Sequence, residues 1–590
     1  MFLKRRVRRK DGKEHVHYAL CESLRVHSGR VIQRQVLHLG ELNTTQIESW
    51  QRTVEVVSED DGARLQRRLF TDREGRAPQE ADDAVEVRLS TLRVRQPRRF
   101  GDCWAGCLLW RRLGLDVFWQ EKLGPLRGEE PWEKVLELLC VNRLLDPKSE
   151  LFVHEKWFAQ TAMDVLLEGD FGLAEKDRLY RTLDHIVAHK EALEKHLASR
   201  WRDLFGATFD IVLYDLTSSY FEGQAGGIPK AKRGYSRDHR PDCKQLVIAL
   251  VVTAEGFPLT YEIFPGNTID VTTLQDIVTK VEAKHGRARR VWVFDRGLTS
   301  EENLAWLRER GACYLVGTPK SQLRDFEAHL TDKKWETVAA GVAVKLCPHD
   351  GDVYVLCRSE RRVQKEHAMR RRTLRACVRD LVRLKRAVAA GRLKDPVLIQ
   401  QRLGGLKERH RPVCRYLRRL AYESGAVVWQ WDREKWQAAV LRDGAYLLRA
   451  HWPGGHDAAQ LWHIYIQLTE AEAAFRALKS EIKIRPFFHQ LERRVEAHIM
   501  IAFLGYALYV CLKKLAAVRA PSLTPWQVLE HLRKIVLVDV EFDTRGGRTL
   551  TLPRITIPEK EQAALLHQLG WTLPDQPPPR IRSTQIPPPA

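Results

Sequence analysis

The chain is 590 residues long, which is enough for about three or four domains of ordinary size and excludes a single small module. Hydrophobic residues make up 44% of it and charged residues 29%, which excludes a disordered or collagen-like chain. Lys and Arg outnumber Asp and Glu by 97 to 76, which gives a net charge of +21. This excess favours a polyanionic partner, with nucleic acid first and an anionic membrane surface second.

Several features predict a cytoplasmic protein that spans no membrane. The first residues are charged from the fourth onward and include no apolar stretch typical of a secretory signal. The longest strongly apolar run, residues 499–512, is shorter than the about 20 residues of a membrane-spanning helix, so we expect a buried core helix there. Eleven Cys without a CxxC pair indicate reduced thiols.

The first third of the chain divides into three predicted segments. Residues 1–57 are basic, and alternating blocks on either side of Ser28 and Gly29 predict a two-stranded ribbon with a glycine turn. Residues 58–95 are polar with little apolar periodicity, which is typical of a connection. Residues 96–205 place apolar side chains three and four positions apart, so we expect a mostly helical region.

Residues 206–320 change to short runs of β-branched and aromatic residues separated by helical patterns. The predicted order is βββαβαβ, which indicates an α/β domain. The second and third strands are expected to form a hairpin. The strands are expected at residues 209–216, 245–253, 257–264, 290–295 and 312–317, and the helices at residues 271–284 and 301–310.

Residues 321–455 interrupt this pattern with strand-like pieces and a very basic helical segment. Between residues 358 and 420 there are 21 Lys and Arg against 5 Asp and Glu. Two interpretations stay open for this segment, namely a solvated helical pair and a surface that contacts phosphates. A helical pattern dominates residues 456–550, and residues 551–590, with seven Pro among the last twenty, predict an extended, unpacked tail.

Three carboxylates stand out by their placement. Asp215 ends the first predicted strand of the α/β block, and Asp295 ends the fourth. An acid at a strand end can simply begin a turn or cap a helix, but two such acids together favour a functional role. Tyr465, Glu472 and Lys479 recur every seven residues in one helical stretch, so they lie on one stripe, which for a generic helix is an exposed polar face.

The chain resembles a known family in a set of motifs. These are YDLT with YFEG, GYSRDHRPDCKQL, EGFPLTYEIFPGNTID, FDRG, and Y-x6-E-x6-K followed by RPFFH. They resemble the bacterial insertion-sequence transposases of the DDE type with the YREK signature, the IS-four group, over roughly residues 16–510. The resemblance implies an RNase H-like catalytic domain with a mixed sheet, interrupted at 321–455 by a largely β insertion with a basic helical segment. A mostly helical DNA-binding region is expected to precede it at 96–205.

The resemblance also implies the catalytic residues. Carried over by motif, Asp215, Asp295 and Glu472 form the triad that binds two Mg²⁺ or Mn²⁺ ions. Hard divalent cations prefer carboxylate oxygens, and two such ions suit the in-line chemistry of phosphodiesters. No His-rich or thiolate site is required.

Other residues are expected to hold the DNA. Tyr465 and Lys479 match the family positions that bind a phosphate, Tyr as a hydrogen-bond donor and Lys as a point charge. Leu468 stands where the family has Arg, and Arg476, one turn beyond Glu472, is a candidate for the same phosphate. A further expectation concerns three tryptophans of the insertion, which either stack on a displaced base or pack in the core: Trp429, Trp431 and Trp436.

The predicted function is cut-and-paste DNA transposition. The protein is expected to bind the terminal inverted repeats of its element, cleave DNA to release a 3′ hydroxyl, and join that hydroxyl to target DNA. The resemblance implies a homodimer in a synaptic complex and a bacterial, nucleoid-associated location. Two alternatives are an inactive or domesticated transposase that only binds DNA and an RNase H-like nuclease selective for DNA structure. A membrane-surface protein is disfavoured because no basic amphipathic helix stands apart from the core pattern.

Overall fold

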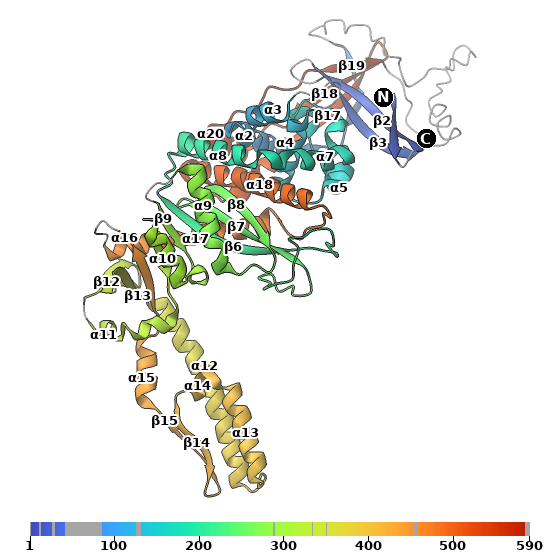
Figure 1. Cartoon of the computed structure of the whole chain (residues 1–590). Coiled ribbons are helices and arrows are strands. Elements are labelled where there is room, and N and C mark those ends of the chain that lie inside the picture. Colours follow the sequence, from blue (N-terminus) through green and yellow to red (C-terminus); the bar gives the residue numbers. More distant parts are fainter. Residues whose placement is uncertain are drawn as a thin grey trace.

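A computed structural model describes the ranges 2–10, 13–25, 30–41, 85–124, 131–286, 290–332, 334–349, 351–452, 455 and 457–583. Within them, helices pack against a large sheet, and a long helical hairpin projects from that sheet (Figure 1). The three-stranded sheet near the N-terminus and a second small sheet lie at the opposite end of the molecule (Figure 1).

The large sheet has the order β11-β12-β13-β16-β10-β9-β6-β7-β8. Its catalytic half follows the predicted βββαβαβ succession: β6 (Ile211–Tyr220), β7 (Gln245–Thr253), β8 (Pro258–Pro265), α9 (Leu274–His285), β9 (Val291–Phe294), α10 (Glu301–Glu309) and β10 (Cys313–Gly317). β6 runs antiparallel to β7 and parallel to β9, and β9 runs parallel to β10. The sheet is therefore mixed, as the resemblance implies, and the predicted hairpin of β7 and β8 is confirmed.

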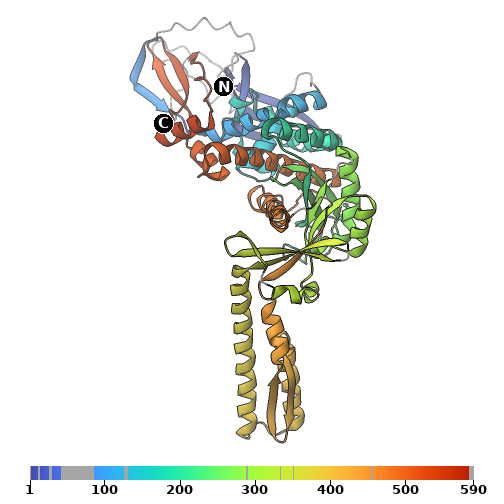
Figure 2. The same ribbon diagram turned by 90° about the vertical axis from the view of Figure 1, so that its left-hand side faces the viewer.

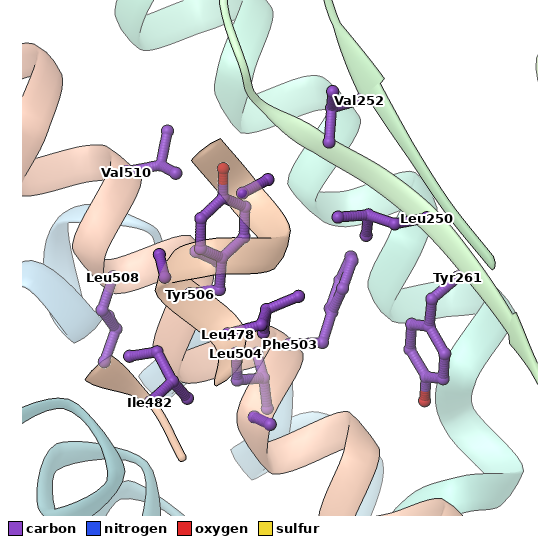
Figure 3. Packing of buried hydrophobic residues seen from close by; sticks show 14 of the residues in the cluster. Leu250, Val252, Tyr261, Leu478, Ile482, Phe503, Leu504, Tyr506, Leu508 and Val510 are labelled. Carbon is purple, nitrogen blue, oxygen red and sulfur yellow. The ribbon is translucent and has the colours of Figure 1, made fainter. Parts of the chain in front are cut away.

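The centre of the sheet is buried on both faces, because every residue of β7 is buried. The apolar helix α18 (Glu492–Arg519) covers one face, and 89% of its most apolar 18-residue window is buried inside the protein. Phe503 on this helix packs against Tyr261 of β8 with ring centroids 5.0 Å apart (Figure 3). The prediction of a buried core helix at residues 499–512 is confirmed.

The predicted helical region at residues 96–205 is confirmed. It comprises α2 (Gly101–Arg112), α3 (Leu115–Leu123), α4 (Trp132–Leu145), α5 (Glu150–Phe152), η1 (Val153–Trp157), α6 (Met163–Leu166), η2 (Phe171–Ala174), α7 (Lys176–Ile186), η3 (Val187–His189) and α8 (Lys190–Phe205). α4 and α7 pack on α18, and a single hydrophobic cluster joins these helices to the central sheet. The helical region is therefore part of the catalytic core rather than a separate domain.

The N-terminal module is a three-stranded antiparallel sheet of β1 (Phe2–Lys10), β2 (Lys13–Arg25) and β3 (Val31–Glu41). The prediction of two strands missed β1, whose basic sequence FLKRRVRRK lacks an alternating apolar face. The predicted turn at Ser28 and Gly29 lies outside the described residues, as do residues 42–84 of the N-terminal module and the following connection.

Two predicted irregular segments are instead partners in a second sheet. It contains β4 (Val87–Val94), β5 (Arg98–Arg99), β17 (Val536–Thr544), β18 (Arg548–Ile555) and β19 (Arg580–Ser583), with α19 (Pro525–Arg533) and α20 (Lys560–Leu569) beside it. The predictions of a connection through residue 95 and an unpacked tail from residue 551 were therefore wrong. β4 needs β17, more than 440 residues away, and the Arg93 to Asp543 ion pair at 2.7 Å joins them. Trp571 packs against Trp104 with ring centroids 5.9 Å apart.

The resemblance implied a largely β insertion, but the structure shows that the insertion is not largely β. Four strands extend the central sheet, β11 (Glu336–Ala339), β12 (Val342–His349), β13 (Asp352–Ser359) and β16 (Ala445–His451), after the short η6 (Lys320–Arg324) and α11 (Glu327–Leu330). The rest is a projecting hairpin of α12 (Glu360–Ala389), α13 (Pro396–Arg409), α14 (Arg411–Cys414), β14 (Leu417–Glu423), β15 (Ala426–Trp431) and α15 (Arg433–Leu441). The basic segment forms helices because one narrow apolar stripe, including Cys377, Leu381, Leu384 and Val388, is buried against its neighbours.

Candidate active site

Asp215 and Asp295 lie side by side, on β6 and directly after β9 of the central sheet. β6 and β9 are parallel neighbours, with Tyr214 paired to Phe294, and each aspartate is the next residue along its strand. β9 ends at Phe294, as predicted, but β6 continues to Tyr220 because its pairing with β7 extends that far, so the prediction that Asp215 ends its strand was wrong. Asp295 is exposed and precedes the short helix η5 (Arg296–Leu298).

The ionisation of Asp215 reflects its acidic neighbours. Burial, with a smaller contribution from the negative charges of Asp295 and Glu472, raises the pKa of Asp215 to about 6. The backbone N–H of Leu216, which donates a 2.7 Å hydrogen bond to Asp215 Oδ1, and the charge of Arg237 act in the opposite direction. The three predicted acids therefore converge, because the charges of Asp295 and Glu472 both act on the carboxylate of Asp215.

The third acid comes from a broken helix. The predicted continuous helix is divided into α16 (Ala458–Ile466), α17 (Leu468–Arg476) and the π-helical turn η7 (Ala477–Glu481). A capping box between Asp457 and Gln460 fixes the start of α16. Glu472 lies on α17 and is exposed, so its carboxylate faces solvent beside the two aspartates.

Tyr465 on α16 joins the same site. Burial raises the pKa of its phenol well above the ordinary range, and the charges of Asp295 and Glu472 add to this shift. A Cβ atom on Gly317, the last residue of β10, would lie 2.5 Å from Tyr465 Oη and 3.7 Å from Asp295 Oδ1. The phenol therefore packs against the glycine backbone next to Asp295, and it stays protonated as a hydrogen-bond donor.

Lys479 takes part in an ion-pair network. Its Nζ is 2.8 Å from Asp238 Oδ1, and Arg485 pairs with the same carboxylate oxygen. Asp238 comes from the connection between β6 and β7, and only 3% of its side chain is exposed. Burial lowers the pKa of Lys479, although the hydrogen bond and charge of Asp238 oppose that shift. Arg476, at the end of α17, is exposed.

The structure does not bring the three tryptophans to the acids. Figure 1 shows β15 and α15 in the projecting hairpin, away from β6 and β9. Trp429 packs against the buried side chains of the hairpin. Trp431 and Trp436 line an open, mostly apolar pocket of about 440 Å³. Their rings are 6.2 Å apart and nearly perpendicular.

One charged residue at the site was not predicted. Arg237 lies in the connection between β6 and β7, and its guanidinium is 2.6 Å from Asp270 Oδ2. Its backbone N–H donates to Ser218 Oγ on β6 at 3.1 Å. The charge of Arg237 acts on both Asp215 and Lys479. The basic motif GYSRDHR was the only signal in the sequence, and no spacing rule connects that loop to the acids.

A second group of titratable side chains is buried away from the predicted triad. Ligand atoms of Glu150, His489 and His498 all lie within 4.8 Å of one another. His489 pairs with Glu150 at 3.5 Å, and His498 Nε2 is 3.1 Å from the carbonyl of Ile484. The charge of Arg143 acts on both Glu150 and His498, so a cation is already present beside this group. Its contacts are those of a structural network.

Comparison with known proteins gives a family. Residues 207–508, slightly more than half of the chain, match the family described as "Transposase DDE domain". Residues 3–67 match the "IS1634 family transposase, N-terminal domain". No curated protein matches the chain.

Two solved structures are similar in part. A piggyBac transposase synaptic complex with hairpin DNA is 9% identical, with 74% of this chain and 82% of that chain covered and a TM-score of 0.34. A Mos1 transposase paired-end complex with the left transposon end is 14% identical, with 33% and 61% covered and a TM-score of 0.14. The matched DDE domain contains all three converging acids. The chain belongs to the transposases with a DDE domain and is a DNA transposase of the insertion-sequence type.

Proposed function

We propose that this transposase binds the terminal inverted repeats of its element, cleaves the DNA at their boundary and joins the released 3′ hydroxyl to target DNA. The observation that carries the proposal is the convergence of Asp215, Asp295 and Glu472 beside β6 and β9 of the mixed central sheet. We assign the three acids as the catalytic, metal-binding triad of the YREK-signature group.

The site suits divalent cations that prefer oxygen. Asp215 is largely desolvated and is repelled by Asp295 and Glu472, so bound positive charge would relieve an unfavourable arrangement. Three carboxylates with no His or Cys among them match the ligand preference of Mg²⁺ or Mn²⁺. When bound, two such ions activate the attacking oxygen and stabilise the leaving oxygen of a phosphodiester. We therefore propose Mg²⁺ or Mn²⁺, two ions, as the cofactor.

The surrounding residues position the DNA phosphate. Tyr465, kept protonated by its surroundings, donates a hydrogen bond to a phosphate oxygen beside Asp295. Lys479 supplies positive charge, and Asp238 holds its amine in place. Arg476 is exposed one turn from Glu472 and can approach the same strand. Trp431 and Trp436 are proposed to stack on a displaced base, because they line an open pocket, although Trp431 also packs against buried side chains of the hairpin, as Trp429 does.

The proposed assembly is a homodimer that holds two element ends in one synaptic complex in the bacterial nucleoid. The net charge of +21 supports DNA as the partner. The N-terminal sheet and residues 96–205 are proposed to bind the inverted repeats. A single active site per chain and two ends to be joined support the dimer.

Incubation of the native protein with a duplex that carries the element's ends tests this function. Boundary cleavage and joining to a target plasmid are expected with Mg²⁺ or Mn²⁺ and not with EDTA. Cleavage of branched DNA without preference for the ends would instead establish a structure-selective nuclease. Binding to the ends without cleavage by any metal would establish a protein that only binds DNA.

A further inference from the structure

The long helix α12 presents an unpaired row of arginines to solvent. Arg371, Arg375 and Arg379 are four residues apart and therefore lie on one helix face, next to Arg372. We call these four residues the arginine face. All four are exposed, and they line an open groove of about 900 Å³ with Gln364 and His367.

In the part of the chain that the structure describes, the positive charge of this face is largely without ion-pair partners. Among the described residues, Arg371, Arg372 and Arg375 form no ion pair, and Arg379 makes only a long contact of 3.7 Å with Asp380. On the same helix, Arg370 by contrast is ion-paired with Asp443. Unpaired, clustered guanidinium groups repel one another, so the arrangement favours an external polyanion.

The helix begins at the proposed active site and leads away from it. Arg362, in its first turn, stacks on Tyr446 with the guanidinium 4.5 Å from the ring, and its charge acts on Tyr465. The 30 residues of α12 extend about 45 Å at the usual rise of a helix. Figure 2 shows α12 running outward from the central sheet as a straight rod. A duplex whose end lies at the acids can therefore continue along this helix.

We propose that the arginine face binds the phosphate backbone of duplex DNA several base pairs from the cleavage site. Guanidinium groups bind phosphates in a bidentate manner without reading bases, so the contact contributes affinity and position rather than sequence specificity. The bound duplex is either the element end or the target DNA. The inference rests on the proposed function. The outcomes of its test distinguish failure of the arginine face from failure of the proposed function.

The experiment measures equilibrium binding of the full-length protein to two duplexes, one with an element end and one of unrelated sequence, over a series of salt concentrations. The double variant Arg371→Ala with Arg375→Ala should reduce the salt slope of binding by about 2, because each lost phosphate contact removes about 0.9. The matched control, Arg402→Ala with Lys407→Ala on α13, removes the same charge from the same hairpin and should leave the slope near that of the native protein.

The two duplexes identify the source of the phosphates. A reduced slope for the end duplex alone assigns the face to the element end, and a reduced slope for both assigns it to DNA in general, target included. Unchanged slopes for both duplexes, with native cleavage intact, would overturn the arginine face while leaving the proposed function in place. An equal reduction in the control variant would also overturn it, because net charge alone would then explain the effect.

A separate observation concerns the arginine missing from the family motif. Leu468 is only 7% exposed and packs in the core, so position 468 delivers no charge to the site. Arg237 lies on the connection between β6 and β7, and its charge acts on both Asp215 and Lys479. Ser218, three residues after Asp215 on β6, holds its backbone, and Asp270 holds its guanidinium.

We infer that Arg237 binds the phosphate at the cleavage site in place of the absent arginine. An arginine whose charge reaches both the proposed triad and the lysine proposed to bind phosphate, and whose guanidinium Asp270 holds in place, suits the binding of the same phosphate. The competing role is that of a counter-ion, which only offsets the repulsion among the acids. The two roles predict different changes when cleavage is measured against Mg²⁺ concentration.

A metal titration of cleavage distinguishes them. If Arg237 binds the phosphate, Arg237→Ala should lower the cleavage rate at saturating Mg²⁺ by at least about tenfold, as the loss of one positioned charge typically does, while binding of the ends is retained and Arg237→Lys recovers part of the rate. If Arg237 is only a counter-ion, the plateau rate should stay native and half-saturation should shift to lower Mg²⁺, which would overturn the inference. Arg240→Ala, on the same connection but paired with Glu222 and Asp242, serves as the control.

Discussion

Asp215 and Asp295 each follow directly after one member of the paired residues Tyr214 and Phe294, so the parallel register of β6 and β9 sets the two carboxylates next to each other. No loop has to close for this pair to form. The relative position of the two aspartates therefore depends on the sheet, and only Glu472 comes from a helix, α17.

Gly317→Ala is expected to impair cleavage by displacing Tyr465. The added Cβ would lie 2.5 Å from Tyr465 Oη, closer than any normal contact, so the phenol must move away from Asp295. Cleavage by Gly317→Ala should fall at least about tenfold, because misplacing a positioned group by an ångström has costs of that order. Single-turnover cleavage of a duplex carrying an element end measures the effect.

A double-mutant cycle gives the control for Gly317. In a Tyr465→Phe background the hydroxyl is already absent, so Gly317→Ala should cost much less than in the native protein. Gly404→Ala on α13, where no atom lies within 4 Å of the added Cβ, should leave cleavage unchanged. Equal losses in the native and Tyr465→Phe backgrounds would mean that Gly317 acts through the fold and not through the phenol.

Glu137→Gln is expected to stabilise the protein at alkaline pH. Burial raises the pKa of Glu137 to about 7 from its ordinary value of 4.5, against the opposing charge of Arg111. The folded chain therefore holds this proton more tightly than the unfolded chain, and the resulting stability is fully present below pH 4.5 and is lost as the pH rises through 7. The variant should gain up to about 3 kcal/mol at pH 8 and little at pH 4.5. Thermal melts across that pH range measure it.

Glu150→Gln is expected to destabilise the protein, in contrast to Glu137→Gln. Burial disfavours its charged form, but the hydrogen bond and charge of His489 outweigh that effect and hold the pKa of Glu150 at about 2. Its charge therefore stabilises the fold above pH 4.5, and this contribution is lost as the pH falls through 2. The variant should melt at a lower temperature than the native protein at pH 7. A rise in both variants at pH 8 would show that removal of any buried acid is stabilising.

The order of elements in the catalytic half was predictable because each one has a strong local pattern. β7 is an uninterrupted apolar run, and Asp295 follows directly after a short apolar strand, although Asp215 lies inside β6 and not at its end. The pairing of β4 with β17 was not predictable from the sequence, because β4 is an exposed basic strand without an apolar face and its partner is distant in the chain. Arg237 was missed for a similar reason, since only the tertiary fold brings its loop over the acids.

Substitution of Trp436 is expected to affect cleavage, whereas substitution of Trp429 is expected to affect stability. Trp429 packs in the hairpin interior, so Trp429→Ala should lower the melting temperature through the cavity that it leaves. Trp436 lines the open pocket, so Trp436→Ala should reduce cleavage with little change in melting, and Trp436→Phe should recover part of it. Native cleavage by Trp436→Ala would remove the stacking role.

The most direct test compares Glu472→Gln with Glu470→Gln on the same helix. Both substitutions remove one charge from α17, but Glu470 is ion-paired with Lys513 at 2.7 Å, whereas Glu472 faces Asp215 and Asp295. Metal-dependent cleavage at the element boundary should disappear in Glu472→Gln, as in Asp215→Asn and Asp295→Asn, while end binding persists, and Glu470→Gln should cleave at close to the native rate. Cleavage that survives in Glu472→Gln would contradict the assignment of these three acids as the catalytic triad.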